Sequence, residues 1–209
     1  MRRIFVGDIH GCREPLERLL AALDFQVGHD ELYPVGDLVA KGPDSPGVLS
    51  LLADLHAKPV IGNHDLAWLH ANRIDSKTLS HWLAQSPVVR EFEDLIVVHA
   101  GLHPHWSDRQ LSRLAASDSV FATNVRYCDE HGVRPRSDWP VPDPPFRPWD
   151  EFYRLPRRVV FGHWARRGFD RTERVIALDS GCVYGGTLTA WIAEEDRVVQ
   201  VPAIAPPRQ

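Results

Sequence analysis

The sequence of 209 residues has few cysteines, no long apolar run and no excess of basic charge. Its three cysteines, Cys12, Cys128 and Cys182, form neither a paired framework nor a Cys-x-x-Cys motif, which argues against a disulfide-rich secreted domain and predicts a reducing, cytoplasmic location. No apolar stretch reaches the length that crosses a membrane, and the first one ends at Gly7, too early for a signal peptide. We therefore expect no membrane partner.

The charges are nearly balanced, with a net charge of −4. This argues against broad electrostatic binding to nucleic acid, although it leaves room for a local cationic pocket. With 44% hydrophobic and 25% charged residues, the composition is that of an ordinary globular domain. We predict one domain over residues 1–209, with a proline-rich loop at 134–149 and a tail at 202–209.

Three glycine-led motifs carry polar side chains and recur at intervals of about 30 residues, the length of a strand–helix–strand unit. They are Gly7-Asp8-Ile9-His10-Gly11, Gly36-Asp37-Leu38 and Gly62-Asn63-His64-Asp65, and each follows a short apolar run. Because corresponding ends of parallel strands meet at one edge of a sheet, we expect these side chains to converge.

Apolar patterning predicts alternating strands and helices in the first half of the chain and short strands in the second half. Strands are expected at residues 4–6, 31–35, 59–61, 95–98, 158–161, 174–178, 187–192 and 197–201. Helices are expected along Leu16, Leu19, Leu20 and Leu23, after Ser45 as an N-cap, from Asp65, at residues 78–85, and after a Ser107/Gln110 capping box. Six prolines and two tryptophans at 134–149 predict a surface loop without regular structure.

Six side chains are candidate metal ligands because each stands just after an apolar run and a turn. They are Asp8, His10, Asp37, Asn63, His99 and His163. Each alone is equally compatible with a turn or a helix cap, but the whole set would require several coincidences. Oxygen and nitrogen ligands without cysteine suit Mn²⁺, Fe²⁺/³⁺, Zn²⁺ or Co²⁺.

The ordered motifs resemble those of the calcineurin-like metallophosphoesterases, in their phosphoprotein-phosphatase-like branch. The matching stretches are Gly7-Asp8-Ile9-His10-Gly11, Gly36-Asp37-Leu38-Val39-Ala40-Lys41-Gly42, Gly62-Asn63-His64-Asp65, His99-Ala100-Gly101 and Gly162-His163. Within that branch the chain is similar to the symmetrical diadenosine tetraphosphatases. That similarity extends to Thr123-Asn124-Val125-Arg126-Tyr127-Cys128, Phe161-Gly162-His163-Trp164-Ala165 and the stretch from Ala177 to Gly186.

The resemblance implies a four-layer α/β/β/α fold and a site for two divalent metal ions, with Mn²⁺ favoured over Fe, Co or Zn. Asp8, His10 and Asp37 would hold the first ion. Asp37 would bridge to the second ion, which Asn63, His99 and His163 would complete. The substrate would then be a nucleotide polyphosphate, cut by a bridging hydroxide in line with the leaving group.

The resemblance also implies roles for five further residues. His64 would be the general acid, oriented by Asp65, and Lys41 and Arg126 would contact phosphate oxygens. Asp179 would not bind metal itself but would help to hold the ligands in position. Diadenosine tetraphosphate would give two ADP.

Two other functions fit the same motifs. A phosphoprotein phosphatase for serine, threonine or tyrosine shares the metal core, but it usually carries Asp-Arg-Gly where this chain has Ala40-Lys41-Gly42. A non-catalytic binding module ranks last because all six ligand positions are filled. We therefore favour the tetraphosphatase.

Only residues 102–122 separate the His-Ala-Gly motif from the Thr-Asn stretch, which is short for this family. We therefore expect an open pocket that grips the second adenosine poorly, with relaxed base preference. Trp106, Trp139, Trp149 and Trp164 are candidates for stacking on a base, but we predict that each of them packs into the protein instead.

Overall fold

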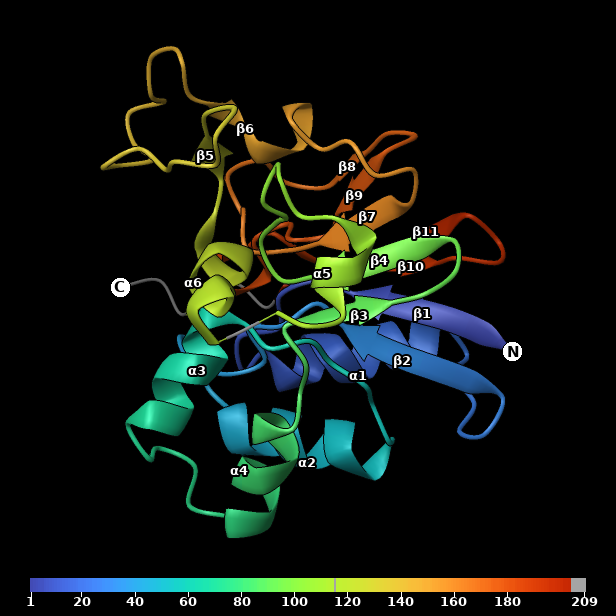
Figure 1. The fold of residues 1–209 in the computed structure, drawn as a ribbon. Helices are drawn as coiled ribbons and strands as arrows, with labels where there is room; N and C mark the ends of the chain where they lie inside the picture. The colour runs from blue at the N-terminus through green and yellow to red at the C-terminus, as the bar shows by residue number, and fades with distance from the viewer. Residues whose placement is uncertain (115, 204–209) are drawn as a thin grey trace.

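The computed structural model describes residues 1–114 and 116–203, and it contains two stacked mixed sheets with helices on both outer faces (Figure 1). The first sheet has the order β11-β10-β1-β2, from β1 (Arg2–Val6), β2 (Asp30–Pro34), β10 (Thr187–Ile192) and β11 (Arg197–Pro202). The second has the order β3-β4-β7-β9-β8, from β3 (Val89–Glu91), β4 (Leu95–Val98), β7 (Arg158–Phe161), β8 (Asp170–Arg171) and β9 (Val175–Ala177). β1 and β2 are parallel, as are β4, β7 and β9.

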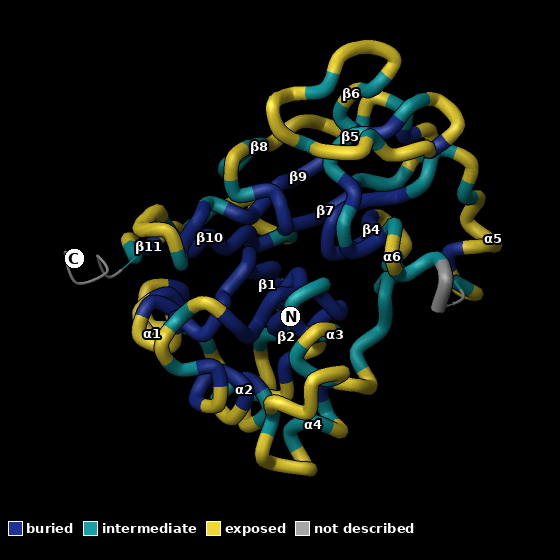
Figure 2. Tube along the Cα trace, turned by 90° about the vertical axis from the view of Figure 1, so that its left-hand side faces the viewer, coloured by how far each residue is buried: buried dark blue, intermediate teal, exposed yellow. Residues whose placement is uncertain are grey.

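The helices are α1 (Arg13–Ala22), α2 (Ser45–Asp54), α3 (Asn63–His70), α4 (Lys77–Ala84), α5 (Asp108–Leu111) and α6 (Ala116–Asn124), with short 3-10 turns η1 (Trp149–Glu151) and η2 (Cys182–Tyr184). A two-stranded ribbon of β5 (Tyr127–Cys128) and β6 (Arg147–Pro148) lies at the end of the molecule opposite α2 and α4 (Figures 1 and 2). No helix in the described ranges is long and apolar enough to cross a bilayer.

Alternation along the strands builds the layers, because successive side chains point to opposite faces of a sheet. Ile4 in β1 packs toward α1, whereas Phe5 packs between the two sheets with Val160 of β7. The next residue, Phe161, lies on the far face of the second sheet with Trp149. Figure 2 shows α1 on one side of this stack, and α5 and α6 on the other. The predicted four-layer α/β/β/α architecture is confirmed.

The expected strand at residues 59–61 is wrong. The segment runs beside β2, because Lys58 N–H donates to the Leu32 carbonyl and Val60 N–H donates to the Pro34 carbonyl. Pro34 has no N–H to donate back, so the pairing does not continue as a ladder. The strand at 174–178 is confirmed in a shorter form, as Val175–Ala177.

Three boundaries also differ from the prediction. Asp44 rather than Ser45 is the N-cap of α2, since its carboxylate accepts the Gly47 N–H at 2.8 Å. The proline-rich segment is not wholly irregular, because Arg147–Pro148 pairs with β5 and η1 begins at Trp149. Pro202 belongs to β11 rather than to a tail, and the remainder, 204–209, lies outside the described residues.

Candidate metal centre

The candidate ligands come together where the strands of both sheets end. Asp8 and His10 follow β1, Asp37 follows β2, and His99 and His163 follow β4 and β7. Nitrogen and oxygen atoms of His10, Asp37 and His64 lie within 4.8 Å of one another, as do those of Asp37, His99 and His163. Asp37 belongs to both groups and is therefore the common member of the cluster.

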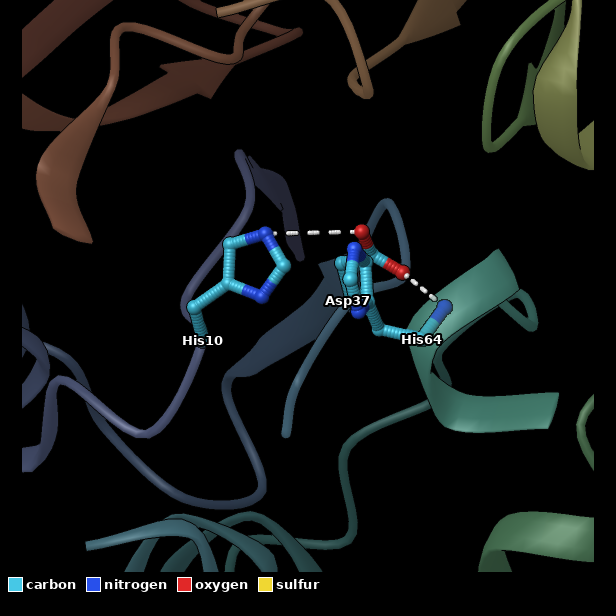
Figure 3. Close-up of side chains that lie close together, drawn as sticks. All are labelled: His10, Asp37 and His64. Atoms are coloured by element: carbon cyan, nitrogen blue, oxygen red, sulfur yellow. Dashed lines mark hydrogen bonds and ion pairs between the residues drawn. The ribbon is translucent and has the colours of Figure 1, made fainter. Parts of the chain in front are cut away.

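The Asp37 carboxylate lies between two imidazoles. Its Oδ2 is 3.4 Å from His10 Nε2, and its Oδ1 is 3.5 Å from His99 Nε2 (the former is drawn in Figure 3). The first residue of α3 joins the group, since Asn63 Oδ1 is 3.1 Å from His99 Nε2. Asp8 Oδ2 lies 4.0 Å from His10 Nε2. The contacts place the oxygen and nitrogen donors around a common centre.

Backbone carbonyls fix the imidazole rings. His10 Nδ1 lies 3.0 Å from the Val39 carbonyl, and His99 Nδ1 lies 2.9 Å from the Val35 carbonyl. His163 uses Nε2 in the same way, 3.2 Å from the Asn124 carbonyl. Histidines that bind metals are typically held by such a bond on one nitrogen, which orients the other. The donor set thus fits divalent cations.

Backbone amides orient the two carboxylates. The His163 N–H lies 3.0 Å and 3.1 Å from the two oxygens of Asp8, and the His64 N–H donates to Asp37 Oδ1 at 2.9 Å (Figure 3). This close approach requires glycine: a Cβ at Gly162 would lie 2.0 Å from Asp8 Oδ1. A Cβ at Gly62 would lie 2.2 Å from Asp37 Oδ1. The glycines that precede the ligands therefore make room for the carboxylates.

Three ligand candidates adopt left-handed backbone conformations: φ is 48° at His10, 51° at Asp37 and 65° at His163. Such angles are uncommon outside glycine and cluster at functional sites, where the surrounding structure holds the strain. The local conformation is thus set by the position that each side chain must take.

The buried charges influence one another strongly. Burial, and next the repulsion of Asp179, raises the pKa of Asp8 well above its usual range. Burial opposes ionisation of Asp37 and of His99, but their mutual attraction lowers the pKa of Asp37 and raises that of His99 to about 10. Burial lowers the pKa of His163, leaving its ring neutral. A protonated His99 thus offsets the buried charge of Asp37, and a bound cation would take over that role.

Asp65 makes different contacts from those expected. Its Oδ1 accepts the Leu38 N–H at 2.9 Å, and its Oδ2 accepts the Gly62 N–H at 3.0 Å. Within residues 1–114 and 116–203 it makes no hydrogen bond to His64, so the expected direct orientation of that ring is not found. Asp65 instead ties the Asp37 loop to the start of α3. Burial lowers the pKa of His64, with Lys41 and His99 adding to the effect against the pull of Asp37.

The expected phosphate contacts lie on opposite sides of the cluster. Lys41 Nζ is 3.2 Å from His10 Nε2, and Arg126 Nη2 donates to the His163 carbonyl at 3.2 Å. Both line a cavity of about 1020 Å³. Asp179 is buried, lines the same cavity and accepts the Gly181 N–H at 3.1 Å. All the predicted site residues except His99 and Asp65 line this cavity. Those two are fully buried, and His99 lies against Asn63 and Asp37.

Sequence reasoning missed the aromatic residues at the cavity rim. Trp139 was expected to pack into the protein but is 62% exposed and lines the cavity, as does Tyr184 at 65%. The packing prediction is right for Trp149, which is fully buried, and for Trp164, which is 9% exposed. A lone tryptophan among prolines, without apolar periodicity, was the available signal for Trp139.

Two stacked mixed sheets with an Asp/His cluster at their strand ends define a metallophosphoesterase, and the chain belongs to the family of calcineurin-like phosphoesterases, whose model matches residues 1–167. It is 34% identical to the symmetrical bis(5'-nucleosyl)-tetraphosphatase of Shewanella sp. strain MR-4, covering 95% of this chain and 97% of that protein. The identity to the protein of the same name from Shewanella baltica strain OS195 is 35% over the same shares.

Solved structures give a consistent picture. A crystal structure assigned provisionally to a diadenosine tetraphosphatase has a TM-score of 0.86 and 36% identity, covering 98% of this chain and 95% of that one. A protein serine/threonine phosphatase of Saccharomyces cerevisiae has a TM-score of 0.60 at 16% identity, covering all of this chain and 81% of that one. The second likeness extends to the fold alone.

Proposed function

We propose that this protein is a symmetrical bis(5'-nucleosyl)-tetraphosphatase that hydrolyses diadenosine tetraphosphate to two ADP. The observation that carries the proposal is the similarity to proteins of that name over 95% of the chain. The fold alone would not choose a substrate, because one fold hosts many functions. The cavity above the ligand cluster is large enough for an extended polyphosphate.

Two divalent ions, with Mn²⁺ favoured, would occupy the cluster. Asp8, His10 and Asp37 would hold one, and Asn63, His99 and His163 would hold the other with Asp37 shared. Support for sharing comes from the place of Asp37 in both groups of donor atoms. When bound, such a pair of ions lowers the pKa of water and offsets charge on the phosphoryl oxygens.

Lys41 and Arg126 would hold the phosphate chain. A central cut requires two phosphates on each side of the broken bond, so anchors are needed on both flanks of the cluster. Lys41 lies beside His10, and Arg126 lies beside His163. Charge-assisted bonds from a guanidinium to phosphate are strong and directional, whereas the ammonium acts as a point charge.

His64 would hold the proton that the leaving phosphate oxygen takes. In the free protein its pKa is lowered, chiefly by burial, so the negative charge of the bound substrate is needed to favour the protonated ring. Asp65 would act at a distance, by fixing the loops that carry Asp37 and Asn63. Asp179 would act on Asp8 through its charge, since its own hydrogen bond is to the Gly181 N–H.

The test is product analysis with a mixed substrate. Adenosine–guanosine tetraphosphate, cut by the Mn²⁺-loaded protein, should give ADP and GDP only on chromatography. AMP with GTP, or ATP with GMP, would mean attack at an outer phosphorus and would refute the symmetrical register. If dinucleoside tetraphosphates stay intact while phosphopeptides are hydrolysed, the protein is a phosphoprotein phosphatase instead.

We place this activity in the cytoplasm. The support is that all three cysteines are buried and free, as expected for a protein that folds in a reducing compartment.

A further inference from the structure

The rim of the cavity carries exposed apolar side chains. Within the described part of the chain, Trp139 and Tyr184 are the exposed aromatic residues, and both line this cavity together with Val141, which is 58% exposed. Aromatic side chains that line a polar cavity are candidates for ligand binding, whereas a single exposed ring elsewhere on a surface would need no explanation.

One ring belongs to the His10 side of the cluster. Lys41 Nζ lies 3.2 Å from His10 Nε2 and 5.3 Å from the centre of the Tyr184 ring. Tyr184 ends the short turn η2, whose flanking glycines, Gly181 and Gly185, have φ of 72° and 90°. A cation and an aromatic ring therefore follow one another outward from His10.

The other ring belongs to the His163 side. Arg126 donates to the His163 carbonyl at 3.2 Å and pairs with Asp138 at 2.9 Å, and the next residue is Trp139. On this side too, a cation lies beside a ligand candidate, and the residue after its ion-pair partner carries a ring that lines the same cavity.

Trp139 is held in place although it is exposed. The Arg166 guanidinium lies 4.0 Å from the centre of one of its rings, and the Trp139 N–H donates to Ser137 Oγ at 3.1 Å. The Ser137 hydroxyl in turn donates to the Trp139 carbonyl at 2.7 Å. Ser137 thus fixes the backbone of Trp139, and Arg166 contacts its ring, so the ring loses little freedom when a ligand stacks on it, which favours binding.

We propose that Trp139 and Tyr184 are stacking platforms for the two bases of a dinucleoside tetraphosphate, an inference that rests on the proposed function. The cavity offers a ring and a cation on one side of the ligand cluster, and a cation and a ring on the other side. The substrate has a matching order, with a base and two phosphates on each side of its central bond. Both ends of the substrate are thus gripped, in contrast to the weak hold on the second adenosine expected from the sequence. Stacking accepts every base because each has a flat face, so base preference is relaxed.

Kinetics of single variants test the two platforms. Trp139→Ala and Tyr184→Ala should each raise KM for diadenosine tetraphosphate about 5- to 140-fold, the range for losing one stacked base. Trp139→Phe and Tyr184→Phe should restore most of it. Turnover of p-nitrophenyl phosphate, which has no base, should not change. Val133→Ala is the matched control, because it shortens an exposed residue, 57% exposed, that does not line the cavity, and its KM should equal that of the unmodified protein.

The double variant sharpens the test. Because the rings would hold different ends of the substrate, the two effects on KM should multiply. A double variant no worse than the poorer single variant would overturn the assignment of one ring to each base. Loss of p-nitrophenyl phosphate turnover in Trp139→Ala, not restored by Trp139→Phe, would also overturn the proposal, because the ring would then only maintain the structure.

A binding measurement separates this inference from the proposed function. Calorimetric titration of the Mn²⁺-loaded protein should show tighter binding of ADP than of pyrophosphate. The difference between the two dissociation constants should be smaller in both alanine variants. That result would support the platforms even if diadenosine tetraphosphate were not cleaved. Cleavage to two ADP with equal ADP binding in all variants would instead support the function and overturn the platforms.

Discussion

The cavity has a floor formed by the buried ligand candidates and a rim formed by the exposed aromatic residues, and the two parts are built in opposite ways. On the floor, Asp8, Asp37 and His99 are 3%, 1% and 0% exposed, and their polar atoms bond to backbone groups. On the rim, Trp139 and Tyr184 are mostly exposed, and each ring contacts a cationic side chain rather than the backbone. Arg166 lies over the Trp139 ring, and Lys41 lies over the Tyr184 ring. The floor has fixed geometry, whereas the rim offers flat or charged surfaces.

The difference follows from what each part must bind. A metal ion needs donor atoms at set distances, so ligands are held by a surrounding shell of hydrogen bonds. A base needs only a ring face, and a phosphate chain needs only charge at about the right place. Substitutions on the floor should therefore abolish catalytic activity, whereas substitutions on the rim should reduce it only in part.

The largest effect is expected for Asp37→Asn, which keeps the side-chain size but removes the charge shared by both donor groups. Metal content should fall from two ions per chain. The loss in kcat/KM should exceed the roughly 10- to 100-fold loss that is typical when a residue that orients a metal ligand is substituted. Elemental analysis of the Mn²⁺-loaded variant provides the check. Asp179→Asn is the matched comparison, with a loss inside that range. Two ions in Asp37→Asn would remove Asp37 as the shared ligand.

His64→Asn should keep both metal ions and lose about 10²- to 10⁴-fold in turnover of poor leaving groups, the usual contribution of a general acid. Phenyl phosphate, whose phenol has a pKa near that of tyrosine, about 10, should suffer more than p-nitrophenyl phosphate. Paired rate measurements on the two esters decide this. A variant that loses metal and both activities alike would make His64 a ligand, consistent with its place beside His10 and Asp37.

Gly162→Ala should weaken metal affinity by about 10- to 100-fold, because the new methyl group must displace the Asp8 carboxylate. Gly168→Ala is the control on the same loop: it has open space around its Cβ and a φ of 73°, so it should lose stability without losing metal. Metal titration and thermal unfolding, measured together, separate the two effects. Equal metal affinity in both variants would show that the floor is less rigid than the contacts indicate.

The smallest effect is expected on the rim, for Asp138→Asn. This change frees Arg126 from an ion pair in which both side chains are 31% exposed, and pairs of that kind contribute little. Pyrophosphate should inhibit p-nitrophenyl phosphate hydrolysis about 1.5- to 5-fold more strongly, with kcat and metal content unchanged. Asp143→Asn removes the same charge from the same segment and should have no effect. Equal gains in both variants would point to net charge rather than to Arg126.

Several features were determined by the sequence alone. The strands at 158–161 and 187–192 have the predicted bounds, because each is a short run of residues that are buried on both faces of the sheet, and such a run can be seen in the sequence. The metal cluster was predictable for the same reason. Four of the six ligand candidates, Asp8, Asp37, Asn63 and His163, directly follow a glycine, and the order of the strands brings these segments together. The prediction failed at residues 59–61, where an apolar run has prolines on the chains that it would pair with.

Other features were decided only by the tertiary structure. Neither the pairing of Arg126 with Asp138 nor the stacking of Arg166 on Trp139 has a local sequence pattern, because the partners lie 12 and 27 residues apart in loops without periodicity. Asp65 is similar: its adjacency to His64 suggested a contact, yet folding turned its oxygens toward Leu38 and Gly62. A buried strand can be recognised from consecutive residues of the sequence, whereas a rim assembled from separate loops exists only once the chain has folded.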